Sequence, residues 1–172
     1  MPERPQRSRR ARAAAGSAAF LVLAPGVAAG LIPWLLTGWR MEGSPVALRL
    51  LGGCLIALGA AFLLHAFYRF VVEGLGTPAP VAPPERLVVG GVYRYVRNPM
   101  YLAVTSCIVG QALLLGWPEL LAYAALFAAV TFSFVHFYEE PTLRGQFGTS
   151  YDAYRHSVPG WIPRLRPWKG GD

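Results

Sequence analysis

The sequence has few charged residues and few cysteines for its length. Only 15% of its 172 residues are charged, whereas a soluble domain carries about a quarter. The two cysteines, Cys54 and Cys107, lie inside apolar blocks and lack the spacing of a metal site or a disulfide framework. These shortages argue against a soluble domain, a bound metal ion and a disulfide-stabilised fold, and both cysteines are interpreted as small packing residues.

Long apolar blocks are present instead, and they predict a membrane protein. Hydrophobic residues make up 54% of the chain, and the mean hydropathy is +0.38. The blocks cover residues 13–39, 46–72, 99–115 and 119–138, and each is near the length that an α-helix needs to cross a bilayer. The predicted fold class is an all-α membrane bundle with about four transmembrane helices. The short turn at residues 116–118 makes the third and fourth helices an antiparallel hairpin.

The chain divides into three parts. Residues 1–12 form a basic arm that is predicted to be disordered, and residues 13–72 carry the first two transmembrane helices. The first apolar run follows basic residues, as in a signal peptide, but it is too long for one, which favours a retained helix. Residues 73–172 contain a loop rich in glycine and proline, the helical hairpin and a polar tail with one or two short interfacial helices that end at Pro159 and Pro163.

Most basic residues flank the apolar blocks, and the formal net charge is +7. Nucleic acid is a usual partner for such a charge in a soluble protein, but this arrangement favours membrane topology and contact with anionic lipid headgroups. Three basic groups share one side of a four-helix topology: Arg4, Arg7, Arg9, Arg10 and Arg12; Arg86, Arg94 and Arg97; and Arg144, Arg155, Arg164, Arg166 and Lys169. The positive-inside rule then places both termini in the cytoplasm, as expected for a multi-pass protein of a bacterial inner membrane.

Two helix ends on the predicted cytoplasmic side carry polar residues. Asn98 followed by Pro99 predicts a helix start, with asparagine as the cap and proline in the first turn. The free backbone N–H groups of that turn attract an anion, and Arg97 stands beside them. The fourth helix is predicted to end at Glu139 and Glu140, where two carboxylates oppose the helix dipole.

These two ends suggest a site for a zwitterion such as an amino acid. The helix start and its arginine would hold the carboxylate, and one of the two glutamates would hold the ammonium group. Nearby aromatic rings could stack on a base or contact a sulfonium group; they are Tyr93, Tyr95 and Tyr101. In a structural alternative, the glutamates are solvated end charges or form salt bridges with Arg94, Arg97 or Arg144.

An ordered pattern runs through two segments, ERLVVGGVYRYVRNPMYLAV and YEEPTLRGQFGTSYDAYRHSVPGWIPR. It reads G-x-Y-x-x-x-R-(N/H)-P-x-Y, then E-E, then F-G-x-x-Y-x-x-Y. Over roughly residues 74–166 it resembles the isoprenylcysteine carboxyl methyltransferase and phospholipid methyltransferase family. The resemblance implies a membrane enzyme that takes S-adenosyl-L-methionine from the cytoplasm and a lipophilic substrate from the bilayer.

The resemblance also implies the members of a cofactor site. The positions that match cofactor contacts in the family are Glu85, Leu87, Val88, Tyr93, Asn98, Pro99, Met100 and Tyr101, and the acidic pair Glu139 and Glu140 completes them. Arg97 joins this site through the helix-start argument, and Arg97, Glu139 and Glu140 are the candidate catalytic residues. A general base is needed only for a protonated acceptor, and then Glu139, Glu140 or His136 could serve.

The sequence departs from the family pattern in two places. Asn98 stands where many relatives have histidine, and asparagine still caps a helix. Many relatives also carry an arginine shortly before the acidic pair, where this chain reads TFSFVHFY. His136 is the candidate replacement and therefore the candidate substrate-binding residue. The acceptor, carboxyl or amine, stays open, as does the oligomeric state.

Two alternative functions compete with methyl transfer. One is an NADPH-dependent membrane reductase of the sterol reductase type, and the other is a non-catalytic membrane scaffold. The expected partners are a lipophilic small molecule from the bilayer and membrane lipids, with neither nucleic acid nor a metal ion.

Overall fold

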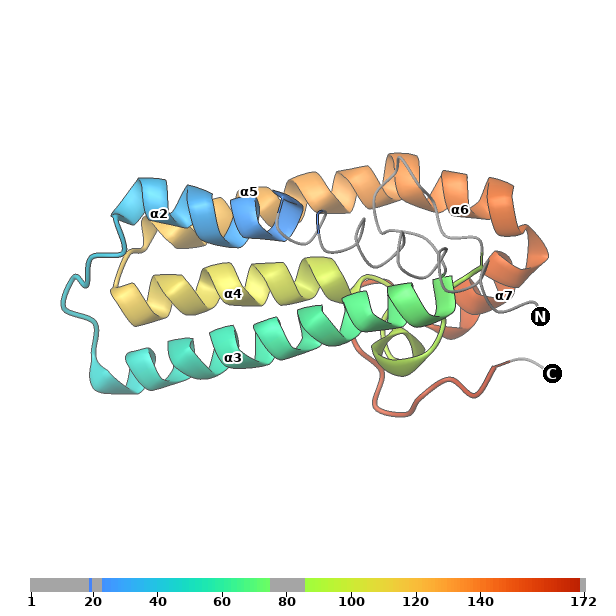
Figure 1. Cartoon of the computed structure of the whole chain (residues 1–172), viewed down its shortest axis with the longest axis horizontal. Helices are drawn as coiled ribbons and strands as arrows, with labels where there is room; N and C mark the ends of the chain where they lie inside the picture. Colours follow the sequence, from blue (N-terminus) through green and yellow to red (C-terminus); the bar gives the residue numbers. More distant parts are fainter. Residues whose placement is uncertain (1–18, 20–22, 75–85, 171–172) are drawn as a thin grey trace, which may run out of the picture.

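The structure is a computed structural model that describes residue 19 and residues 23–74 and 86–170. In this part of the chain every regular element is helical, which confirms the all-α fold class (Figure 1). The predicted disordered arm, residues 1–12, and the candidate site residue Glu85 lie outside the described residues. The elements in chain order are η1 (Val27–Leu31), α2 (Ile32–Thr37), α3 (Val46–Arg69), η2 (Phe70–Gly74), η3 (Gly91–Arg94), α4 (Pro99–Leu115), α5 (Glu119–Phe134), η4 (Val135–Glu139), α6 (Glu140–Phe147) and α7 (Thr149–Ser157).

Within the described residues, two helices are long and apolar enough to cross a membrane. One covers the 28 residues Val46–Glu73, and the other covers the 29 residues Glu119–Phe147. Two shorter apolar helices cover Leu23–Thr37 and Pro99–Leu115. At 1.5 Å per residue, the second of these is about 25 Å long, slightly less than the ~30 Å hydrocarbon core of a bilayer.

Helices α3 and α4 pack closely because glycines remove side chains from their contact. A Cβ atom at Gly52 would lie 2.5 Å from the carbonyl oxygen of Gly110, and one at Gly59 would lie 2.8 Å from that of Ala103. The Ser106 hydroxyl also donates a hydrogen bond from α4 to a backbone carbonyl of α3. The two helices therefore form a tight pair that leaves no room for larger residues at these positions.

Two connections meet at one end of the helices, on the left in Figure 1. The backbone N–H of Glu42 donates to the carbonyl of Leu115 at 2.7 Å, and the Trp117 indole donates to the carbonyl of Arg40 at 2.9 Å. Gly116 has a φ of +80°, and a Cβ there would lie 2.7 Å from the Glu42 carbonyl oxygen. This glycine therefore permits the tight turn from α4 to α5.

The predicted helix end at the acidic pair is wrong. Helix α5 continues through the π-helical turn η4 into α6, so Glu139 and Glu140 lie within one continuous helix. Pro141 occupies the first turn of α6 and lacks the N–H that an α-helix requires. The wider hydrogen-bond spacing of η4 directly precedes this proline and accommodates the missing bond. The two carboxylates therefore do not oppose a helix terminus.

The tail folds back toward the start of α4, on the right in Figure 1. Of the one or two short helices predicted for the tail, one separate helix, α7, is present and ends at Ser157, close to the predicted end at Pro159. Helix α6 continues the long helix, and residues 159–169 are not helical. The carbonyl of Pro159 accepts a hydrogen bond from the backbone N–H of Arg97, and that of Gly160 accepts one from Asn98. The tail is thereby attached to the segment that precedes α4.

Candidate functional site

A cavity of about 390 Å³ lies where the start of α4, the η4–α6 junction and α7 come together. Its lining includes ten of the eleven predicted cofactor residues: Leu87, Val88, Tyr93, Arg97, Asn98, Pro99, Met100, Tyr101, Glu139 and Glu140. The eleventh, Glu85, lies outside the described residues. Residues far apart in the sequence are therefore brought to one cavity.

The cavity lining is apolar apart from a small set of polar groups. Apolar side chains come from the N-terminal helix, the end of α3, α4, α5 and η4; they include Ala24, Ala28, Phe67, Phe70, Val104, Phe127, Phe134 and Val135. Charged groups and tyrosines come from residues 93–101, from Tyr138 and the acidic pair, and from α7. An apolar ligand portion and a charged ligand portion can therefore bind in the same cavity.

The start of α4 agrees with the sequence in one respect and differs in another. Pro99 occupies the first turn, as predicted, and Asn98 is the residue at the cap position. The predicted side-chain cap is wrong, because Asn98 makes no capping hydrogen bond. Its backbone N–H instead donates to Gly160, which anchors the residue to the tail. The amide nitrogen Nδ2 of Asn98 is buried and has no hydrogen-bond partner in the described residues.

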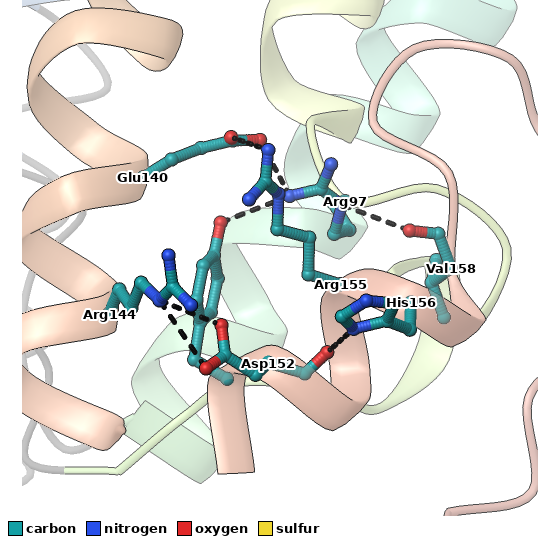
Figure 2. A network of polar contacts seen from close by, with 8 residues as sticks. Arg97, Glu140, Arg144, Asp152, Arg155, His156 and Val158 are labelled. Atoms are coloured by element: carbon teal, nitrogen blue, oxygen red, sulfur yellow. Dashed lines mark hydrogen bonds and ion pairs between the residues drawn. The ribbon is translucent and has the colours of Figure 1, made fainter. Parts of the chain in front are cut away.

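Arg97 belongs to a partly buried network, shown in Figure 2. Its Nη1 donates to Oε1 of Glu140 at 2.6 Å and to the Tyr151 hydroxyl at 3.0 Å, and its Nε donates to the carbonyl of Val158 at 2.9 Å. Arg155 approaches the other oxygen of Glu140 at 3.2 Å. The side chains of Arg97 and Glu140 are only 12% and 13% exposed. Of the arrangements predicted for the acidic pair, Glu140 therefore adopts the salt bridge to Arg97.

Glu139 has a different environment from its neighbour. The Tyr101 hydroxyl donates a hydrogen bond to Oε2 of Glu139 at 3.0 Å. The charge of Glu140 faces two guanidinium groups, whereas that of Glu139 faces a neutral phenol. A carboxylate next to a phenol and an apolar cavity favours the binding of a cation more than a carboxylate between two arginines.

Helix α7 contributes two cavity residues that the sequence interpretation missed. Tyr151 and Tyr154 are 2% and 3% exposed and lie three residues apart, on one face of the helix. The Tyr154 hydroxyl donates to the carbonyl of Tyr93 at 2.7 Å, and the Tyr151 hydroxyl accepts from Arg97. Burial raises the pKa of both phenols above the ordinary value, so both stay neutral. The Y-x-x-Y part of the sequence pattern is the signal that pointed to them.

Two other candidates lie away from the cavity. Among the described residues, neither His136 nor Tyr95 contributes to the lining. The His136 ring is exposed and stacks on Phe132 with centroids 6.3 Å apart, and it meets Phe137 edge to face at 4.8 Å. In the helical register through η4, Val135 and Glu139 line the cavity, while His136 and Phe137 point elsewhere.

Comparison with known proteins assigns the family. A family model described as phospholipid methyltransferase matches residues 48–150, which is more than half of the chain. The chain belongs to this family, and with its two long apolar helices it is a membrane protein of the methyltransferase class. It is also 38% identical over 82 residues to the protein-S-isoprenylcysteine O-methyltransferase of Schizosaccharomyces pombe.

The likeness to this yeast protein is partial. The match covers 46% of this chain and 34% of the relative, so the chain spans about a third of the length of the curated protein that it matches. No solved structure gives a significant match.

Proposed function

We propose that this protein transfers a methyl group from S-adenosyl-L-methionine to a lipophilic acceptor at the cytoplasmic face of the membrane. The observation that carries the proposal is the cavity, which combines an acidic pair, an arginine and a helix start with an apolar lining. Its volume of about 390 Å³ lies within the usual range for small-molecule sites. The family assignment supports the reaction class.

The polar groups of the lining fit this methyl donor. The hydroxyl of Tyr93 and the Nδ2 of Asn98 are buried, and within the described residues neither has a hydrogen-bond partner. Buried polar groups are rarely left without partners in a complete site. The amino-acid and nucleoside portions of the donor offer acceptors and donors for both.

The residues of the cavity have separate roles in this proposal. Glu139 binds the ammonium group of the donor, because its own partner is a neutral phenol. Arg97 and the N–H groups at the start of α4 bind the donor carboxylate, and Glu140 and Tyr151 hold Arg97 in position. When bound, the donor supplies a methyl group that is activated by its positive sulfur. The chain orients the reactants and excludes water, which suits a direct displacement in which the protein itself forms no covalent bond to the methyl group.

The acceptor is proposed to approach through the apolar part of the lining, from the bilayer side. A carboxylate acceptor needs no base, and an ammonium or alcohol acceptor needs one. Glu139 and Glu140 both line the cavity and are the candidates for that task, whereas His136 lies outside it. The apolar lining supports a lipophilic substrate and is compatible with a carboxylate, ammonium or alcohol acceptor.

The proposed topology has four spans with both termini in the cytoplasm. The two long helices are supplemented by Leu23–Thr37 and Pro99–Leu115, which are short for a span and predominantly apolar. The distribution of arginine supports this orientation. Single cysteines at positions 8 and 169, in a chain without Cys54 and Cys107, should be labelled only from the cytoplasm, and labelling from the other side contradicts the topology.

Ligand binding by the purified protein tests the function. In detergent, S-adenosylmethionine and S-adenosylhomocysteine should raise the melting temperature, and NADPH should not. Stabilisation by NADPH alone supports a reductase, and no response to any of the three supports a scaffold. Incubation with membrane lipids and a methyl-labelled donor should then transfer label to a lipid fraction, and acid and base stability of the product distinguishes an ester from an amine.

A further inference from the structure

The C-terminal segment 159–169, hereafter the strap, carries the most exposed large hydrophobic side chain of the described residues, Leu165. The strap is non-helical and runs from the end of α7 (dark red in Figure 1). Ile162 is 78% exposed and Leu165 is 99% exposed. Arg166 and Lys169 are exposed beside them, and the strap contains no aspartate or glutamate. An exposed leucine between two arginines, Arg164 and Arg166, is unfavourable in water but fits the surface of a bilayer.

The strap is attached to the segment that lines the cavity. Besides the bonds from Pro159 and Gly160 described above, the N–H of Arg164 donates to the carbonyl of Tyr95 at 3.0 Å. The N–H of Trp168 donates to the carbonyl of Arg94 at 2.9 Å. The backbone on both sides of Arg97 is therefore hydrogen-bonded to the strap.

The strap also contacts α4 and α5 through an aromatic side chain. Trp161 packs against Tyr101 of α4 and Phe132 of α5, with ring centroids 6.2 and 5.6 Å apart. Tyr101 is the residue that donates a hydrogen bond to Glu139. Further exposed aromatic side chains are Tyr68, near the end of α3, and Phe137 and Tyr138 in η4. Tyrosine and tryptophan side chains are enriched at membrane–water interfaces.

We propose that the strap binds anionic phospholipid headgroups at the membrane surface and that this binding organises the donor site. Leu165 and Ile162 insert between the lipids, while Arg166 and Lys169 contact the headgroup phosphates. The hydrogen bonds to residues 94–98 transmit the position of the strap to Arg97 and Asn98. The second part of the proposal rests on the proposed function, and the first part does not.

A fluorescent probe on the strap tests the first part. Leu165→Cys, in a full-length chain with Cys54→Ala and Cys107→Ala, carries an environment-sensitive fluorophore. The protein is placed in nanodiscs of phosphatidylcholine or of an equal mixture of phosphatidylcholine and phosphatidylglycerol. The probe should be quenched more strongly by spin-labelled lipid in the mixed nanodiscs. Arg166→Gln with Lys169→Gln should remove this difference, and the matched control Arg40→Gln, at the opposite end of the helices, should retain it.

Donor affinity in the same nanodiscs tests the second part. S-Adenosylhomocysteine, titrated by calorimetry, should bind about fivefold more tightly in the mixed nanodiscs, the lower end of the usual coupling between two binding events. The Arg166→Gln, Lys169→Gln variant should lose this gain and keep the affinity measured in neutral lipid.

The outcomes separate the two proposals. Quenching that is independent of lipid charge overturns the lipid site, and equal affinity in both nanodiscs overturns its coupling to the donor site. If S-adenosylhomocysteine binds in neither lipid, the proposed function fails, and the fluorophore still decides whether the strap binds anionic lipid.

Discussion

The two halves of α4 are built in opposite ways. In its middle, Gly110 packs backbone against backbone on Gly52 of α3, and no side chain fits between them. At its start, Asn98 and Tyr101 line a cavity and contact the tail and the acidic pair. Close backbone packing stabilises the first region, whereas hydrogen bonds and charged groups stabilise the second. The same helix is therefore a rigid support in one part and the wall of a cavity at its start.

The largest expected effect comes from breaking the charge network of the cavity. Glu140→Gln should lower the free energy of unfolding by about 3 kcal/mol, because it leaves the largely buried guanidinium group of Arg97 beside a neutral amide and also removes the partner of the more exposed Arg155. The matched control is Asp152→Asn, whose partner Arg144 is 62% exposed, and it should cost less than about 1 kcal/mol. Denaturant unfolding in detergent measures both. Equal losses would show that the buried network adds nothing beyond a surface pair.

The next effect concerns the helix pair that supports the site. Gly52→Ala should destabilise the protein by about 1–3 kcal/mol, because the new Cβ meets backbone atoms of α4. Gly53→Ala is the matched control, since nothing lies within 4 Å of a Cβ there. It should be neutral or slightly stabilising. Denaturant unfolding measures the stability of both variants. Similar stabilities would contradict the close approach of α3 and α4.

A smaller effect is expected from a single hydrogen bond in the cavity wall. Tyr154→Phe should cost about 1 kcal/mol, because it removes a buried bond to the carbonyl of Tyr93 and keeps the ring. Tyr68→Phe, at a 60% exposed position, should cost nothing measurable. Thermal unfolding compares the pair. A stable Tyr154→Phe variant would mean that ring packing alone holds α7 against the cavity wall.

The smallest effect is expected at His136. His136→Ala should leave the affinity for S-adenosylhomocysteine within about twofold of the wild type, or ~0.4 kcal/mol, because the ring lies outside the cavity on an exposed helix face. Calorimetry measures this directly. A tenfold loss would assign His136 to the donor site despite its position.

The helix bounds were well predicted where the sequence contains strong local signals. Helix α4 runs from Pro99 to Leu115 as predicted, because proline starts it and Gly116 ends it. The helix that contains the acidic pair was mispredicted because Pro141 usually ends a helix, and a π-helical turn that accommodates a proline has no clear local signal. Local chemistry thus predicts ordinary helix ends and misses irregular ones.

The site was predicted only in part, for a related reason. The motif residues Tyr93, Arg97, Asn98 and Tyr101 were identified because they stand together in the sequence, and they do line one cavity. The pairing of Arg97 with Glu140 was one of several open choices, because helix rotation decides which of two adjacent glutamates meets it. Contacts that depend on tertiary packing, such as those of α7, are not fixed by any local pattern.

Titration of a Glu139→Gln variant with S-adenosylhomocysteine tests the central claim most directly. If Glu139 binds the ammonium group of the donor, the substitution should weaken binding at least about tenfold, or 1.4 kcal/mol, and leave the melting temperature of the free protein unchanged. Glu119→Gln, an exposed glutamate at the other end of α5, is the matched control and should bind like the wild type. A folded Glu139→Gln variant with wild-type affinity contradicts the proposed donor site.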